Sequence, residues 1–146
     1  GDYVQAGIPR EDVWIDSSDG IKIHAWYLAP INASSNNASS SKASNGGGSS
    51  SNPAFAMLMS HGNGENITHT LWEADRIRRN YDIAVMLYDY RGFGKSEGSP
   101  YERGVLDDAE AAWNWLANRT SLTNNNIFLF GRSLGGGVAV HLAATK

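Results

Sequence analysis

The sequence contains no cysteine, which excludes disulfides, thiolate metal sites and a cysteine nucleophile from its 146 residues. It also lacks any apolar run near the ~18 residues that cross a membrane, and it does not open with a basic stretch followed by an apolar one. Neither charge is in large excess, since 12 Lys and Arg residues against 15 Asp and Glu residues give a net charge of −3. Composition therefore favours neither nucleic acid nor an anionic membrane surface as a partner, and leaves small neutral molecules open.

What is present suits one globular domain, with 41% apolar residues and 10% aromatics. Two short apolar runs, 13–15 and 21–28, flank the step Asp19-Gly20, which is typical of tight turns between antiparallel strands. Residues 31–52 are almost wholly Asn, Ala, Ser and Gly, and cannot bury enough apolar surface to offset the entropy of ordering them. We expect one domain over 1–146 that opens with a β-hairpin and carries a flexible loop insert at 31–52.

Strands and helices then alternate along the chain. The pattern predicts strands at 54–60, 83–88 and 127–130, and helices at 70–80, 100–118 and from 134 onward. Ser99, Pro100 and Glu102 match the N-cap, first turn and capping box of the second helix. The fold class is therefore α/β, with a mostly parallel sheet covered by helices.

Residues 131–135, with the sequence Gly-Arg-Ser-Leu-Gly, lie between a predicted strand and a predicted helix of small residues. A serine at such a turn is presented at the carboxyl end of the strand, and the flanking glycines allow the turn to be sharp. We expect Ser133 to be a catalytic nucleophile that needs a histidine base and a carboxylate behind it. The backbone N–H of Leu134 is expected to donate to the oxyanion, and Gly136 and Gly137 to allow close helix packing.

A second oxyanion donor is expected in the run His61-Gly62-Asn63-Gly64, which follows the strand at 54–60. We assign the backbone N–H of Asn63. If the loop conformation were shifted by one residue, the backbone N–H of Gly64 would be the donor instead. The non-functional alternative is that the segment is a plain glycine-rich turn at the start of a helix.

A third segment runs from Asp89 to Gly98 with the sequence Asp-Tyr-Arg-Gly-Phe-Gly-Lys-Ser-Glu-Gly. Together with the runs at 61–63 and 131–136 it resembles the α/β-hydrolase superfamily over about residues 13–146. Residues 128–142 are most similar to the branch that includes alpha/beta hydrolase domain-containing protein 13 and the fungal bud-emergence proteins. The resemblance implies an eight-stranded sheet, a Ser-Asp-His triad in that chain order, and hydrolysis of esters, thioesters or amides without a metal or an organic cofactor.

The triad Asp and His of that family follow later strands, whereas this chain opens at Gly1 and stops within an expected helix. We therefore expect the N-terminal part of a larger hydrolase domain, truncated after the helix that follows Ser133 and inactive alone. We interpret His61 as a brace for its own loop and expect Arg91 to pair with Asp89, both as structure. Localisation and oligomeric state stay open.

The expected function of the complete protein is that of a serine hydrolase, esterase, lipase or thioesterase, acting on a small acyl substrate. A non-catalytic binding or scaffold protein with the same fold is the alternative. Nucleotide binding is not expected, because Asp89 stands where a phosphate loop ending in Gly94-Lys95-Ser96 would need its first glycine.

Overall fold

The computed structural model describes residues 7–32 and 52–146. The expected hairpin and the alternation of strands and helices are both present. In chain order the elements are β1 (Glu11–Asp16), β2 (Lys22–Leu28), β3 (Ala56–Ser60), α3 (Ile67–Tyr81), β4 (Ala84–Tyr88), α4 (Glu102–Thr120), a 3₁₀ turn (Asn124–Asn126), β5 (Ile127–Gly131) and α5 (Leu134–Thr145). Most of the insert predicted at 31–52 lies outside the described residues.

The strands form one sheet in the order β1-β2-β4-β3-β5. β1 and β2 make the antiparallel hairpin, and β2 runs antiparallel to β4. β3 pairs in parallel with β4 on one side and with β5 on the other. The α/β fold class is confirmed, and the described sheet is mixed because the hairpin adds two antiparallel pairings to the parallel ones.

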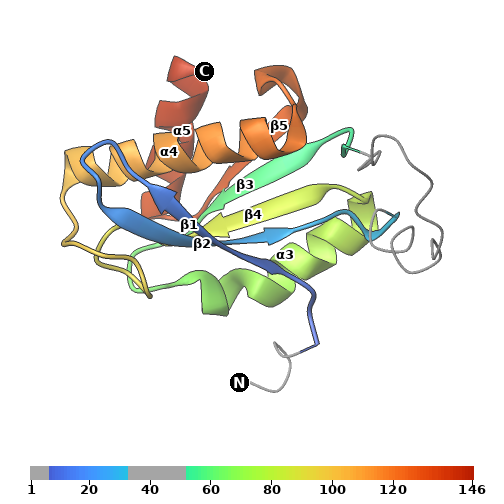
Figure 1. The fold of residues 1–146 in the computed structure, drawn as a ribbon, viewed down its shortest axis with the longest axis horizontal. Coiled ribbons are helices and arrows are strands. Elements are labelled where there is room, and N and C mark those ends of the chain that lie inside the picture. The colour runs from blue at the N-terminus through green and yellow to red at the C-terminus, as the bar shows by residue number, and fades with distance from the viewer. Residues whose placement is uncertain (1–6, 33–51) are drawn as a thin grey trace, which may run out of the picture.

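The sheet is the middle of three layers, as Figure 1 shows: α3 lies against one face, and α4 and α5 lie against the other. All five residues of β4 are buried, as expected for a central strand covered on both faces. The buried face of α4 includes side chains at helical spacing that pack on the sheet: Val105, Ala109, Ala112 and Leu116.

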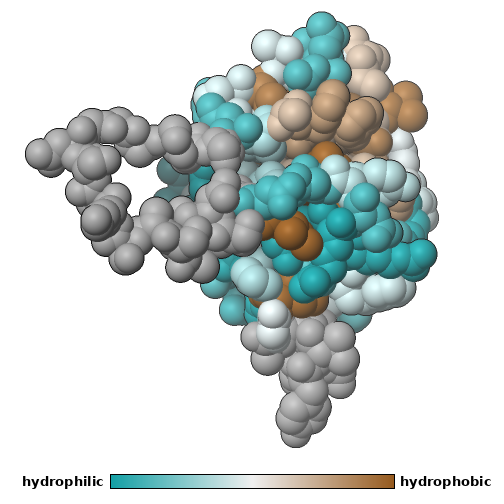
Figure 2. Space-filling model, turned by 90° about the vertical axis from the view of Figure 1, so that its right-hand side faces the viewer, coloured by the Kyte–Doolittle hydropathy of each residue, from teal (hydrophilic) through white to brown (hydrophobic). Residues whose placement is uncertain are grey.

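β5 ends the strand order and contacts only β3 in the described part of the sheet. Its Phe128 is 50% exposed and its ring stacks on that of Phe55, with the centroids 5.7 Å apart. Figure 2 shows hydrophobic residues gathered on the upper part of one face, while much of the remaining described surface there is hydrophilic. Among residues 7–32 and 52–146, no helix is both long and apolar enough to span a bilayer.

The predicted start of α4 is wrong. The helix begins at Glu102 after Tyr101, which is extended and makes no side-chain capping bond, so Ser99 is not its N-cap. The reason lies in the preceding loop: Gly92 has φ of +80°, and a Cβ there would come within 2.4 Å of Pro100 Cδ. Pro100 is thus packed on the loop after β4 and does not form the first turn of the helix.

Candidate active site

Three strand ends are aligned in the sheet. Ser60 is opposite Tyr88 in the β3–β4 pair and opposite Gly131 in the β3–β5 pair. Each of these residues is followed at once by one of the three sequence motifs. Since parallel strands carry their carboxyl ends to one edge, the motifs at 61–64, 89–98 and 132–135 gather there, where α/β proteins bind ligands.

Ser133 adopts φ of 54° and ψ of −115°, a conformation that L residues rarely take, in the short turn between β5 and α5. The turn is tight enough to exclude side chains on both sides. A Cβ on Gly131 would lie 2.0 Å from the carbonyl oxygen of Gly135, and one on Gly135 would lie 1.9 Å from that of Ser60. This supports the role predicted for the two glycines, whose lack of a side chain permits the close contact.

The close approach predicted for Gly136 and Gly137 is wrong. A Cβ on Gly136 would meet its nearest atom at 3.9 Å, and one on Gly137 would meet none within 4 Å. The backbone of α5 comes closest to the sheet at Gly135, and further along the helix Val138 and Leu142 are buried in the core.

The loop after β3 lies beside Ser133. A Cβ built on Gly62 would be 3.5 Å from the Ser133 Cβ and 3.3 Å from the Arg132 carbonyl oxygen. Asn63 is exposed, and its backbone N–H has no hydrogen-bond acceptor among the described residues. The same holds for the N–H of Leu134, the first residue of α5. The two N–H groups predicted as oxyanion donors are therefore on adjacent segments, and neither donates a hydrogen bond to an acceptor among the described residues.

His61 is buried and braces this loop. Its Nδ1 donates to the Gly62 carbonyl oxygen over 2.9 Å. Its Nε2 lies 3.0 Å from Asp89 Oδ1, which is ion-pair distance, but the contact does not have hydrogen-bond geometry. Tyr90 donates its hydroxyl to the His61 carbonyl over 2.8 Å and packs its ring 4.5 Å from the imidazole. Burial raises the pKa of Tyr90, so it remains a neutral donor.

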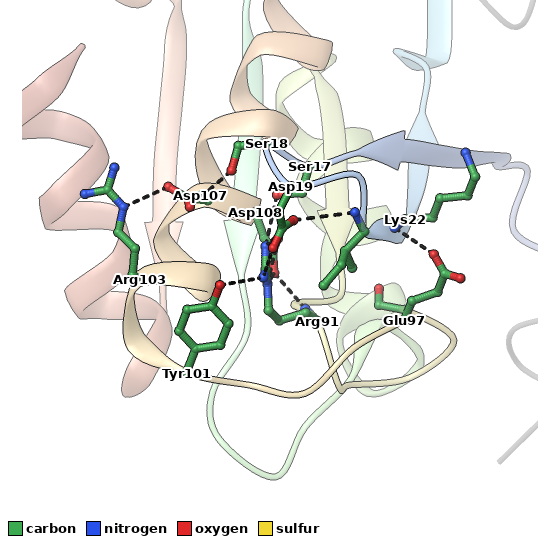
Figure 3. A network of polar contacts seen from close by, with 12 residues as sticks. Ser17, Ser18, Asp19, Lys22, Arg91, Glu97, Tyr101, Arg103, Asp107 and Asp108 are labelled. Carbon is green, nitrogen blue, oxygen red and sulfur yellow. Dashed lines mark hydrogen bonds and ion pairs between the residues drawn. The ribbon is translucent and has the colours of Figure 1, made fainter.

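The predicted pairing of Arg91 with Asp89 is wrong. Asp89 turns toward α3, where its Oδ1 accepts the N–H of Ile67 over 3.0 Å. Arg91 is fully buried and instead places its guanidinium against Asp108 of α4, with Nη2 2.9 Å from Oδ1, and against Asp19 of the β1–β2 turn, with Nη1 2.6 Å from Oδ2. Figure 3 shows this network joining the hairpin turn, α4 and the loop after β4.

The prediction failed because it chose Asp89, the carboxylate nearest to Arg91 in the sequence. The actual partners come from segments that are distant in the sequence. The hydrogen bonds that Arg91 donates to Asp108, and then those to Asp19, raise its pKa, so the buried group is permanently charged. A buried charge that is fully paired is a structural tie, which agrees with the non-catalytic role expected for Arg91.

Glu65 was missed in the sequence. Its Oε2 accepts the N–H of Gly62 over 3.0 Å, and its Oε1 lies 3.4 Å from Nη1 of Arg132, the residue before Ser133. The hydrogen bond from Gly62, followed by that from Arg132, lowers the pKa of Glu65. Arg132 also contacts Glu73 of α3 over 2.5 Å, and this contact, with the one to Glu65, raises the pKa of Arg132. Only the three-residue spacing between Gly62 and Glu65 hinted at this contact.

Two of the other three histidines have structural partners. His24 on β2 is buried and lies 2.7 Å from Asp12. His69 accepts the Asn66 N–H in the capping box of α3. His141 is on α5, two turns beyond Ser133. Within residues 7–32 and 52–146 there is also no group of three or more His, Asp or Glu side chains suited to a metal ion.

Residues 51–146 match a family model described as "Serine aminopeptidase, S33". The alpha/beta hydrolase domain-containing protein WAV2 of Arabidopsis thaliana is 33% identical over 132 residues, which are 90% of this chain and 37% of that protein. An uncharacterized membrane protein of Saccharomyces cerevisiae is 30% identical over 94% of this chain and 42% of its own length. The chain thus spans about two fifths of these curated relatives.

Solved structures share the fold. The alpha/beta hydrolase GrgF from a Penicillium species has a TM-score of 0.71 at 24% identity, covering 95% of this chain and 43% of its own. The Pyrococcus furiosus esterase Pf2001 has a TM-score of 0.67 at 18% identity, covering 94% of this chain and 45% of its own. At these identities the likeness concerns the backbone arrangement.

Proposed function

This chain belongs to the α/β-hydrolase superfamily, and on that premise we propose that the complete protein is a serine hydrolase that cleaves acyl substrates through Ser133. The Leu134 and Asn63 N–H groups serve as the oxyanion hole. The triad Asp and His lie beyond the end of this chain, and the mechanism needs no metal or organic cofactor.

The observation that carries the proposal is the strained backbone of Ser133, with φ of 54° and ψ of −115°. Such a conformation costs on the order of 1–3 kcal/mol, and strain of this kind clusters at functional sites. It exposes Ser133 at the edge where the three motifs meet, with α5 starting at the next residue. The partial positive charge of a helix N-terminus then favours an oxyanion at that point.

The chemistry follows the general course of serine acyl transfer. The Ser133 Oγ attacks the acyl carbonyl carbon while its proton passes to the histidine, and the carbonyl electron pair moves to oxygen. The oxyanion accepts the N–H groups of Leu134 and Asn63. Collapse expels the alcohol, thiol or amine, which takes the proton from histidine and leaves acyl-Ser133. Water then repeats both steps, releasing the acid and restoring the hydroxyl.

The histidines of the described chain support a base that comes from elsewhere. His61 donates to the Gly62 carbonyl from a buried position, and His24 is held by Asp12 on β2. Both imidazoles are therefore engaged by structural partners within the described chain. The 146 residues alone are therefore expected to show no turnover.

Esters, lipids or thioesters are the substrate classes that we propose, and the esterase of Pyrococcus furiosus that shares the fold supports an ester. The family description as a serine aminopeptidase favours a peptide amide as the second candidate. A non-catalytic scaffold with this fold is the alternative, and it would have no need for the strain at Ser133.

The test is covalent labelling of the full-length protein by a fluorophosphonate probe. We expect labelling of the wild type and none of Ser133→Ala or Ser133→Gly. The glycine variant should also be more stable by about 1 kcal/mol, since relief of ~1–3 kcal/mol of strain exceeds the ~0.5–1 kcal/mol of added unfolded-chain entropy. A wild type that remains unlabelled, with Ser133→Ala no different, would support the scaffold.

A further inference from the structure

The peptide unit that joins Gly62 to Asn63 is held on its carbonyl side. The Gly62 oxygen accepts His61 Nδ1 over 2.9 Å and the Glu65 N–H over 3.3 Å. In a trans peptide the C=O and the N–H point in opposite directions. Fixing the Gly62 carbonyl toward the protein therefore aims the Asn63 N–H the other way.

The preceding peptide unit is held as well. The Gly62 N–H donates to Glu65 Oε2 over 3.0 Å, and the His61 carbonyl accepts the Tyr90 hydroxyl over 2.8 Å. Glu65 thus contacts Gly62 twice, through its backbone N–H and through its carboxylate. The side chain is 28% exposed, so the contact is formed at the surface of the loop and can be removed without opening the core.

The second carboxylate oxygen of Glu65 faces the other half of the site. Arg132 Nη1 lies 3.4 Å from Oε1, and Nη2 of the same guanidinium lies 2.5 Å from Glu73 of α3. The backbone of Arg132 is tied to β3 by its N–H, which donates to the Ser60 carbonyl over 3.2 Å. Arg132 directly precedes Ser133, so its side chain links the nucleophile turn to Glu65.

We propose that Glu65 is a positioning residue that, together with Arg132, sets the distance between the two oxyanion donors by bridging the loop of Asn63 to the turn of Ser133. This rests on the proposed function, since it assigns a role within the same site. Its warrant is geometric: one carboxylate accepts a backbone N–H from the first segment with one oxygen and a guanidinium from the second with the other. An oxyanion hole works only when both donors are 2.7–3.1 Å from the developing charge.

The perturbation to measure is Glu65→Ala in the full-length enzyme, with an ester substrate. Removal of a donor costs ~10²–10³-fold in kcat, and loosening one should cost less, so we expect kcat to fall about tenfold with KM within twofold. Inhibition by a trifluoromethyl ketone, whose adduct carries the oxyanion, should weaken by about the same factor. Glu65→Gln keeps an oxygen that can accept the Gly62 N–H and should recover most of the loss.

Arg132→Met tests the bridge from its other end. We expect a smaller loss than from Glu65→Ala, and a double variant no worse than Glu65→Ala, because Arg132 acts through Glu65. Arg79→Met is the matched control. It removes a similarly exposed arginine, 57% exposed against 45% for Arg132, from an ion pair on α3 with Asp75, and should leave kcat unchanged.

The outcomes separate this role from the proposed function. If Ser133→Ala hydrolyses the ester as fast as the wild type, the serine mechanism itself is wrong. If Ser133→Ala is inactive while Glu65→Ala matches Arg79→Met in kcat and in ketone affinity, only the positioning role is overturned. Additive losses from Glu65→Ala and Arg132→Met would also overturn it, since they would show that the two residues act separately. Circular dichroism selects an assay temperature at which every variant is folded.

Discussion

Asp108 holds the buried charge of Arg91, and its replacement by Asn should destabilise the protein strongly. Both side chains are fully buried. Asp108 also accepts the Arg91 backbone N–H over 2.8 Å. Breaking a buried pair from one side costs ~3–5 kcal/mol because the remaining charge is left uncompensated. Asp19, whose side chain is 41% exposed, still pairs with the guanidinium in this variant. We therefore expect the loss of stability to be at the lower end of that range, about 3 kcal/mol.

Urea unfolding of the full-length protein measures this loss. With a denaturant dependence of ~1–3 kcal/mol per molar, 3 kcal/mol lowers the midpoint by about 1 M or more. Asp107→Asn is the control, since the neighbouring carboxylate on α4 contacts the 80% exposed Arg103 and should contribute less than ~1 kcal/mol. The double variant Arg91→Met/Asp108→Leu should recover stability relative to Asp108→Asn, because it removes both buried charges. Equal midpoints for Asp108→Asn and Asp107→Asn would refute the reasoning.

Two further predictions concern the site. Gly135→Ala should destabilise the protein by about 3 kcal/mol and abolish probe labelling, because its Cβ would lie 1.9 Å from a backbone oxygen. Gly137→Ala is the control: its Cβ would meet no atom within 4 Å, and it should stabilise the protein by ~0.5–1 kcal/mol. Thermal melts and probe labelling compare the two variants, and equal effects would contradict the close contact at Gly135. The pKa of Glu65 is lowered by the Gly62 N–H, so the stability that this carboxylate contributes is complete above its ordinary value of 4.5 and is lost as pH falls through the lower folded value. Urea unfolding at pH 6 and pH 3 measures how much stability is lost on acidification. This loss should be smaller for Glu65→Gln than for the wild type, and an equal or larger loss in the variant would contradict the prediction.

Local signals were sufficient for much of the fold. Short apolar runs and turn residues predicted all five described strands, and the glycines around Ser133 predicted the sharp turn, because these features depend on neighbours in the sequence. The prediction of Ser99 as an N-cap was wrong because tertiary packing overrides the local motif. Pro100 is packed against Gly92 and does not start α4. Oxyanion geometry at Asn63 and Leu134 stays a prediction.

Long-range partners were the part that sequence reasoning could not supply. Asp108 is 17 residues from Arg91 and Asp19 is 72 residues away, and neither spacing carries a periodic signal. Glu65 reaches Arg132 across 67 residues in the same way. Such pairs depend on strand order, here β1-β2-β4-β3-β5, which the alternation of elements leaves open.

Strand register, more than any single side chain, determines whether the candidate site can exist. Ser60 opposes Gly131, and its carbonyl both accepts the Arg132 N–H and limits residue 135 to glycine. A slip of one residue between β3 and β5 would turn the side chains of β5 to the opposite face and separate Gly62 from Ser133. The backbone strain at Ser133 therefore persists because relaxing it would require the parallel pairing of β3 and β5 to shift, and that pairing is anchored by residues buried in the core on both sides of the sheet.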